Sequence, residues 1–371
     1  MLANVAQPRR QNPRSRRGER SPAAESFHFR GHGADDNATL GPVLISVLLP
    51  ARNAAATLPE ALAGVLAQQG VELEVVCVDD ASTDGTRGIL EQAQRRDERV
   101  RVVPGAGRGL VAALNLGLAH CRGSLVARMD ADDLVRRDRL RLQADLLARA
   151  PALGAVGSLV RCIPRPLTPG LARLEAWLDS LVTAQQCHDA RFIEAPLVHP
   201  SATFRREALE GVGGWQDHGW AEDWDLFLRL IEAGFELAKV PEILLWWRDS
   251  PERLTRTGAA YRSEQMVRLR AHYLARGPLR DRPFDLFGAG PTGKRLARAL
   301  EPHGLRPRCF YDVDRGKQVA RGARVLHATE LPPPGEALLV CAVGASGARE
   351  EIRAMVGAQG YVEGRDYLFA A

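Results

Sequence analysis

The chain has 371 residues, 45% hydrophobic and 26% charged, which is enough for two domains with sizeable cores. Residues 9–20 hold six arginines and one glutamate, which accounts for the whole net charge of +5. The rest of the chain is close to neutral, so nucleic acid is not an expected partner. The six cysteines show no Cys-x-x-Cys spacing, which argues against zinc and redox motifs and favours a reducing cytoplasm.

Residues 1–42 are polar, rich in arginine, and without apolar periodicity, so we predict a disordered basic tail. The tail lacks the apolar segment of a secretory signal, and no later run of about 18 apolar residues predicts a membrane span. We therefore expect a cytoplasmic protein, whose arginine cluster allows peripheral attachment to the anionic inner face of the membrane.

From residue 43 the chain alternates between apolar strand patterns and amphipathic helix patterns. Thr57 and Glu60 have the spacing of a capping box, which predicts the start of the first helix. The predicted strands are 43–50, 73–80, 99–105 and 124–130. Strands separated by helices predict an α/β fold with a parallel sheet and helices on both faces.

After Asp133 the alternation is looser, with predicted helices at 171–185, 221–234 and about 258–276 and predicted strands at 196–206 and 236–248. A second alternation begins at Phe284, after a polar segment with Gly277 and Pro278. We therefore predict a first domain over 43–277, a linker over 278–283 and a smaller α/β domain over 284–371.

Acidic side chains follow two of the predicted strands. Asp79 and Asp80 end the second strand, and Asp130, Asp132 and Asp133 follow the fourth. Ligands of an open parallel sheet bind at the carboxyl ends of its strands, so these acids should converge. Carboxylates this close raise one another's pKa values, which indicates a divalent cation held together with substrate phosphates.

A separate acidic pair, Glu222 and Asp223, begins the predicted helix at 221–234. The pair either stabilises the helix N-terminus or supplies a general base that faces the metal pocket. His199 is expected to be a satisfied structural histidine rather than a ligand. Three tryptophans near the pair either pack in the core or stack on a sugar ring: Trp215, Trp220 and Trp224.

Five segments, in this order, resemble a family-2 glycosyltransferase with the GT-A fold: ISVLLPARNAAATLPEAL, VVCVDDASTDGT, GLVAALNLGLAHCRGSLVARMDADD, HPSATFRREAL and AEDWDLFLRL. The resemblance covers about residues 44–250. It implies a mixed, mostly parallel sheet with helices on both faces. It also implies an inverting, metal-dependent transfer of one sugar from a nucleotide-diphosphate sugar to an acceptor hydroxyl, in the synthesis of surface polysaccharide or glycoconjugate.

The resemblance also assigns roles at the donor side by position. Pro50 and Arg52 line the nucleotide pocket, and Asp79 and Asp80 bind the nucleobase and ribose. Asp130 contacts the sugar nucleotide.

Metal and acceptor roles follow in the same way. Asp132, with Asp130, holds Mn²⁺ or Mg²⁺ on the diphosphate, and Asp133 supports them. Asp223 deprotonates the acceptor, which is a saccharide or a lipid-linked molecule, and Glu222 lies beside it.

The segment LLWWRDSPERLTRT departs from the family pattern. Many relatives have a histidine there that completes the metal shell, whereas this chain has Arg248 and Asp249. A third metal ligand is therefore open, and Arg248 or Arg253 is expected to contact phosphate. The Gln-x-x-Arg-Trp motif of processive synthases is absent from the sequence, which favours transfer of one sugar per event.

The second α/β segment has the spacing of a dinucleotide-binding turn. Gly288, Gly290 and Gly293 form Gly-x-Gly-x-x-Gly between a strand and a helix, and Asp312 ends the next strand. The segment resembles the first half of a Rossmann domain, which implies either a site for NAD or another nucleotide or a packing role. It has no Tyr-x-x-x-Lys motif, which disfavours an oxidoreductase.

Two other functions fit parts of the sequence. A catalytically inactive regulatory protein could bind a nucleotide or dinucleotide through residues 284–371, although the acids at 80, 130, 132 and 223 are intact. A nucleotidyltransferase shares an acidic metal pocket, but it needs a glycine-rich phosphate loop after the first strand, and PARNAAATL lacks one.

Overall fold

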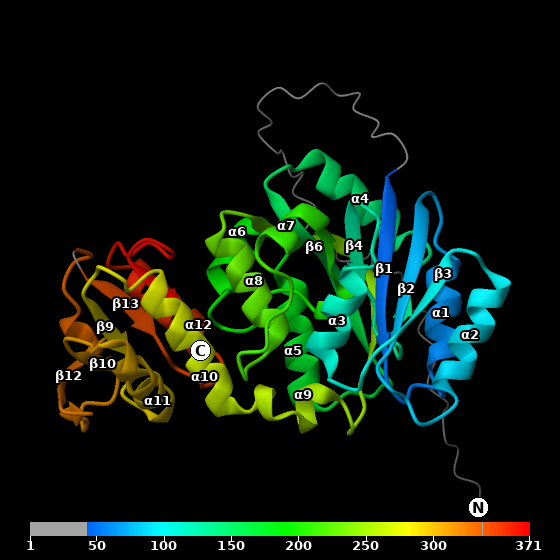
Figure 1. Ribbon diagram of the computed structural model, residues 1–371. Coiled ribbons are helices and arrows are strands. Elements are labelled where there is room, and N and C mark those ends of the chain that lie inside the picture. Colours follow the sequence, from blue (N-terminus) through cyan, green and yellow to red (C-terminus); the bar gives the residue numbers. More distant parts are fainter. Residues whose placement is uncertain (1–42, 336) are drawn as a thin grey trace, which may run out of the picture. The chain divides into compact units, whose positions relative to one another are not determined.

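The computed structural model describes residues 43–335 and 337–371, which belong to one compact unit (Figure 1). The predicted basic tail, residues 1–42, lies outside the described residues. Two sheets organise the described chain, one of eight strands and one of six.

The larger sheet has the strand order β3-β2-β1-β4-β7-β6-β8-β5. Its strands are β1 (Leu44–Ala51), β2 (Glu72–Asp79), β3 (Val100–Pro104), β4 (Leu125–Arg128), β5 (Leu134–Val135), β6 (Leu153–Ile163), β7 (Thr203–Arg205) and β8 (Glu236–Arg248). Strands β3, β2, β1 and β4 pair in parallel, as do β6 and β8, whereas β7 and β5 pair antiparallel to their neighbours. The predicted mixed, mostly parallel sheet is confirmed.

Helices cover both faces of this sheet because its central strands are apolar on both sides. Alternate residues of β1 point to opposite cores: Val47 packs with α1 and α4, and Leu48 packs with α3, α7 and α8. These helices are α1 (Leu58–Leu66), α2 (Thr86–Arg96), α3 (Leu110–Leu118), α4 (Arg139–Arg149), α5 (Pro169–Ser180), α6 (Ala184–Ala190), α7 (Arg206–Gly211) and α8 (Glu222–Glu232). No helix within 43–335 and 337–371 is long and apolar enough to cross a bilayer.

Three local predictions were wrong or incomplete. Thr57 makes no capping hydrogen bond, because its backbone is in the α region and not in the extended region that capping needs; its hydroxyl donates to Ala131 O (3.0 Å). Strand β6 was not predicted, since Gly154 and Gly157 weaken its local pattern and pairing with β8 decides its conformation. Of the predicted strand at 196–206, only β7 (Thr203–Arg205) is a strand; the 3-10 turn η1 (His199–Ser201) precedes it, and Arg206 begins α7.

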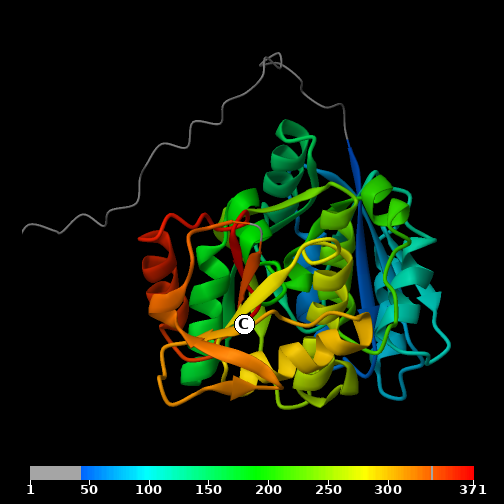
Figure 2. The same ribbon diagram turned by 90° about the vertical axis from the view of Figure 1, so that its left-hand side faces the viewer.

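The smaller sheet has the order β11-β12-β10-β9-β13-β14 and is turned towards the viewer in Figure 2. Its strands are β9 (Phe284–Phe287), β10 (Phe310–Asp312), β11 (Val319–Ala320), β12 (Ala323–His327), β13 (Leu338–Cys341) and β14 (Tyr367–Phe369). All pairs except β11–β12 are parallel. Around it lie η3 (Glu301–His303), η4 (Ala328–Glu330), α11 (Pro291–Leu300) and α12 (Ala348–Gly357). The five parallel strands run in the Rossmann order 3-2-1-4-5.

Three helical elements connect the two sheets along the chain, after β8 and before β9: α9 (Leu254–Thr257), η2 (Ala259–Tyr261) and the longer α10 (Ser263–Arg276). The guanidinium of Arg270, on α10, donates to the carbonyl oxygens of Phe192 and Ile193 and lies 4.8 Å from the ring centroid of Trp224. One hydrophobic cluster includes Trp224, residues of α10, and Leu286 of β9. The segments carrying the two sheets are therefore packed together through α10.

We predict that Gly293→Ala destabilises the chain by about 2–3 kcal/mol, because its Cβ would lie 1.9 Å from Gly288 O. Gly290→Ala is the matched control in the same turn, since its Cβ would meet nothing within 4 Å. Urea unfolding of both variants tests this, and equal midpoints for the two would contradict it.

Candidate functional site

The loop after β4 carries the central acids and is held from two sides. Thr57, at the start of α1, donates to Ala131 O, and the end of β8 supplies Arg248. The backbone N–H of Arg248 donates to Asp133 Oδ1 (2.7 Å), and its Nε donates to Asp132 O (2.7 Å). The loop is therefore fixed by elements distant in sequence.

Asp130, Asp132 and Asp133 converge, with ligand atoms all within 4.8 Å of one another. Burial and the charge of Asp130 raise the pKa of Asp132 to about 6 and raise that of the buried Asp133. Asp133 Oδ2 is buried and has no hydrogen-bond partner. Repelling carboxylates with an unpartnered buried oxygen fit a hard divalent cation, and Asp133 is the candidate for the third ligand.

Arg128 lies at the centre of the site and was missed by sequence reasoning. It ends β4, is 2% exposed, and forms an ion pair with Asp130. Its Nη1 makes this ion pair, and its buried Nε has no hydrogen-bond partner. Its charge acts on Asp132 and also on Asp223, so one buried cation influences both acidic groups.

Glu222 and Asp223 begin α8, and their environments differ. Glu222 accepts a hydrogen bond from Tyr261 Oη (2.5 Å) and lies 3.7 Å from His199 Nδ1. Burial alone would raise the pKa of Glu222, but these two contacts bring it below its ordinary value. Burial and the charge of Glu222 raise the pKa of Asp223 to about 8. The pair thus combines a fixed anion with a carboxyl of high proton affinity.

His199 is a buried structural histidine, as predicted. Its Nε2 accepts a hydrogen bond from Trp215 Nε1 (2.8 Å), and burial lowers its pKa, so it is neutral. Trp215 and Trp224 are 1% and 0% exposed, which places both in the core and excludes stacking on a sugar. Trp224 Nε1 donates to Arg191 O (2.8 Å).

Two further side chains at the site carried no recognisable sequence signal. Glu194 lies on the segment that Arg270 holds, and burial raises its pKa. Its charge acts on Asp223, which it reaches only through the tertiary fold. Trp247, on β8, stacks under the guanidinium of Arg253 at 3.9 Å from the ring centroid.

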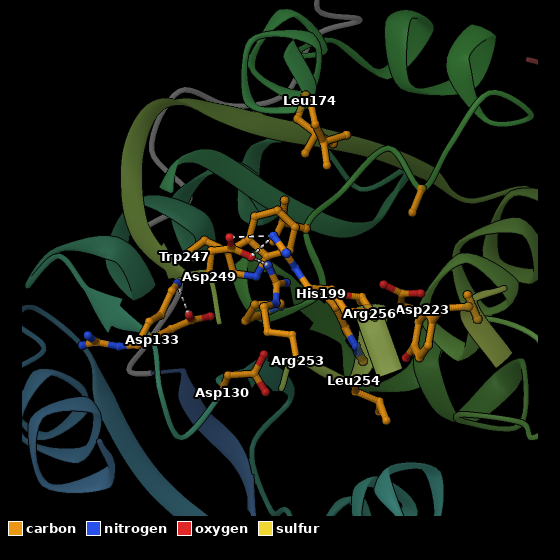
Figure 3. Close-up of a pocket in the computed structure, with 18 of the residues that line it drawn as sticks. Asp130, Asp133, Leu174, His199, Asp223, Trp247, Asp249, Arg253, Leu254 and Arg256 are labelled. Atoms are coloured by element: carbon orange, nitrogen blue, oxygen red, sulfur yellow. Dashed lines mark hydrogen bonds and ion pairs between the residues drawn. The ribbon is translucent and has the colours of Figure 1, made fainter. Parts of the chain in front are cut away.

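Both acidic groups line one cavity of about 540 Å³. Figure 3 shows Asp130, Asp133, His199 and Asp223 around it, with Arg253 near the middle of the view. Asp132, Glu194 and Glu222 also line it. A cavity of this size holds a small ligand. The acids after β4 suit a charged group, and the pair at the start of α8 suits a hydroxyl.

Of the predicted nucleotide-sugar residues, Asp130 lines this cavity, whereas Pro50, Arg52, Asp79 and Asp80 lie at the ends of β1 and β2 and do not. Asp80 accepts hydrogen bonds from the backbone N–H groups of Arg108 (3.1 Å) and Gly109 (2.9 Å), and lies 3.7 Å from Arg52 Nη1. Asp79 lies 3.8 Å from Arg87 Nη1. Pro50 is buried within β1.

The loops after β1 and β2 are joined by hydrogen bonds, and each has a residue with a strained backbone. Asn53 has φ of 51° and Ala81 has φ of 56°, values that are uncommon outside glycine. The N–H of Asn53 donates to Ser82 Oγ (3.0 Å), and Asn53 Oδ1 accepts from Thr83 N (2.8 Å). Strain of this kind is retained where the surroundings fix it, commonly at ligand sites.

The glycine-rich turn after β9 has the geometry that its spacing predicts. Gly288 has φ of 108°, and Gly293 lies against Gly288 O, so α11 approaches the turn closely. Asp312, however, is engaged: it accepts from Ala289 N (2.8 Å) and pairs with Lys317 Nζ (3.0 Å). Its carboxylate therefore supports the turn.

The chain is similar to known glycosyltransferases in sequence and in fold. Residues 46–213 match the family model described as Glycosyl transferase family 2. The chondroitin synthase of Escherichia coli is 27% identical over 212 residues, which are 56% of this chain and 29% of that protein. The EpsE protein of Bacillus subtilis, named as a glycosyltransferase, is 27% identical over 228 residues, 60% of this chain and 79% of that protein.

The succinoglycan biosynthesis protein ExoO of Rhizobium meliloti is 41% identical over 112 residues, 30% of this chain and 31% of that protein. The chain thus spans less than a third of the chondroitin synthase and about a third of ExoO. S. aureus TarS 1–349, solved with UDP-GlcNAc, aligns with a TM-score of 0.53 at 18% identity and covers 72% of this chain and 74% of that chain. This likeness confirms the predicted GT-A fold.

We predict that Asp223 makes the metal-free protein less stable as pH rises. Its folded pKa of about 8 exceeds its ordinary value of 3.8, so the folded state retains a proton that the unfolded state releases between these values. Asp223→Asn removes this loss, so its melting temperature relative to wild type should rise between pH 5 and pH 9, by roughly 2 °C or more. A constant offset across that range contradicts the assignment.

Proposed function

We propose that the chain, whose residues 46–213 match the model of glycosyl transferase family 2, moves one sugar from a nucleotide-diphosphate sugar to the hydroxyl of a saccharide or lipid-linked acceptor, with inversion. The proposed setting is the synthesis of surface polysaccharide or glycoconjugate. The observation that carries the proposal is that two differently tuned acidic groups face one cavity.

Asp223 is the proposed base. Its raised pKa gives the carboxylate the proton affinity that an alcohol requires, and it lies in the cavity beside Glu222. The acceptor hydroxyl passes its proton to Asp223 as its oxygen bonds to the anomeric carbon. The bond from that carbon to the diphosphate oxygen breaks on the opposite side, and the nucleoside diphosphate leaves with the electron pair. Glu222, fixed by Tyr261, keeps Asp223 basic through its charge.

Asp130, Asp132 and Asp133 are the proposed ligands of Mn²⁺ or Mg²⁺, and the unpartnered Asp133 oxygen supports this choice. A bound divalent cation would offset the charge that develops on the leaving diphosphate. Of the two arginines considered for phosphate contact, we propose Arg253. Arg248 is already bonded to Asp132 O and, at 3.1 Å, to Glu60.

The nucleoside is proposed to lie beside Pro50, Arg52, Asp79 and Asp80, at the carboxyl ends of β1 and β2. The hydrogen bonds of Asn53 to Ser82 and Thr83 join the loops after these strands and so fix the position of these four residues. In this proposal the nucleoside lies outside the cavity and the transferable sugar lies within it.

We also propose that residues 43–277 form the catalytic domain, 278–283 the linker, and 284–371 a Rossmann-like domain. Gly288, Gly290, Gly293 and Asp312 are its proposed second nucleotide site. Titration of the full chain with NAD or another nucleotide tests this site. Loss of nucleotide binding in Gly290→Ala supports the site. The added methyl group would enter open space at the turn, where the nucleotide is proposed to lie, and would not clash with the protein. Equal binding by that variant contradicts it.

We predict that Asp223→Asn lowers transfer by about 10²–10⁴-fold while donor binding is retained, because only the proton acceptor is lost. Asp132→Ala should instead lose metal-dependent binding of the donor. Calorimetric titration with UDP, GDP, dTDP and CDP, each with Mn²⁺ and with EDTA, measures binding, and release of the diphosphate measures transfer. Asp145→Asn, in an exposed ion pair on α4, is the control. Wild-type transfer by Asp223→Asn would remove it as the base.

A further inference from the structure

Part of the cavity lining is apolar. Five apolar side chains from different sides of the cavity make up this part, which we call the leucine wall: Leu171 and Leu174 of α5, Trp247 of β8, Leu254 of α9 and Met266 of α10. All five side chains keep some exposure. Diphosphate, ribose and sugar hydroxyls gain no hydrogen bonds there, so a nucleotide-sugar donor does not account for this wall.

Leu254 is the most informative member of the leucine wall. It is 47% exposed and lines the cavity, whereas the other large exposed hydrophobic residues of the described chain, Val313, Val319 and Val362, do not. Exposed apolar side chains gathered at a cavity indicate a ligand surface.

The short helix that carries Leu254 is anchored. The carboxylate of Asp249 accepts two hydrogen bonds from Arg256 Nη2 (2.8 and 2.7 Å) and lies 3.7 Å from Arg253 Nη1. These contacts fix α9 at the margin of the cavity. Figure 3 shows Leu174 and Leu254 at opposite margins, with Trp247, Asp249 and Arg253 between them.

We propose that the acceptor is amphipathic: its hydroxyl-bearing head reaches Asp223, and an alkyl, aryl or isoprenoid-like group lies on the leucine wall. This inference rests on the proposed transfer of a sugar. The leucine wall and the acids share one cavity of about 540 Å³, so one molecule can contact both. Four of the five side chains are only partly exposed, which suits a chain entering a cavity better than a bilayer lying on a surface.

Octyl and methyl β-glucoside are suitable probes because they share one head and differ in the apolar group. With the full chain and octyl glucoside below its micelle concentration, we expect calorimetry or saturation-transfer NMR to show at least tenfold tighter binding of octyl glucoside. Each methylene that leaves water contributes up to about fourfold in affinity.

Leu254→Ser should weaken octyl glucoside binding at least threefold, and Leu174→Ser together with Leu254→Ser should remove the preference for the octyl group. Val362→Ser is the matched control, because Val362 is 48% exposed and lies outside the cavity. Equal binding of the two glucosides, or equal effects of Leu254→Ser and Val362→Ser, overturns the proposal. So does a Leu254→Ser variant that loses binding to phosphatidylglycerol vesicles but keeps its affinity for octyl glucoside.

Titration of the same samples with nucleoside diphosphates separates this inference from the proposed function. Diphosphate binding without any octyl preference overturns the amphipathic acceptor and leaves the transferase intact. An octyl preference without binding of any diphosphate overturns sugar transfer, and with it the assignment of the apolar ligand as an acceptor.

Discussion

Repulsion among buried carboxylates is the constraint on which this site depends. Six carboxylates line one cavity: Asp130, Asp132, Asp133, Glu194, Glu222 and Asp223. Interactions between charges are stronger there than in water because the protein interior has a lower dielectric constant. The chain offsets this repulsion unevenly. Arg128 pairs with Asp130, and Tyr261 and His199 stabilise Glu222 as an anion. Asp133 and Asp223 receive less compensation, so their pKa values rise. These two carboxyls are the ones proposed to bind a cation and to accept a proton.

The sheet explains how so many charges come to one place. Parallel strands β1, β2 and β4 end at one edge, and the long β8 returns to the same region from the other half of the sheet. After β8 the chain passes across the cavity and supplies Arg253 and Tyr261 before α10 begins. The proposed substrate contacts thus come from segments on either side of the acids.

Sequence patterns identified the elements whose neighbours along the chain determine them. The parallel half of the sheet, the acids after β4 and the pair at the start of α8 were all found from local periodicity and spacing. What escaped depended on tertiary contact. Strand β6 takes its conformation from β8, and Thr57 bonds to Ala131 instead of capping its own helix. Glu194 and Tyr261 carry no motif, and only the fold brings them to the acids. Arg128 lies two residues before Asp130, but its burial and its ion pair with Asp130 depend on the tertiary structure.

The hydrophobic cluster around α10 has a consequence for how the chain can be divided. Trp224 lies one residue from the proposed base, yet its cluster includes Leu286 of β9, in the segment that carries the second sheet. A cut within residues 278–283 would leave part of one shared core on each fragment. The segment after residue 283 therefore helps to support the position of Asp223, and separating it would disturb the site as well as the second sheet.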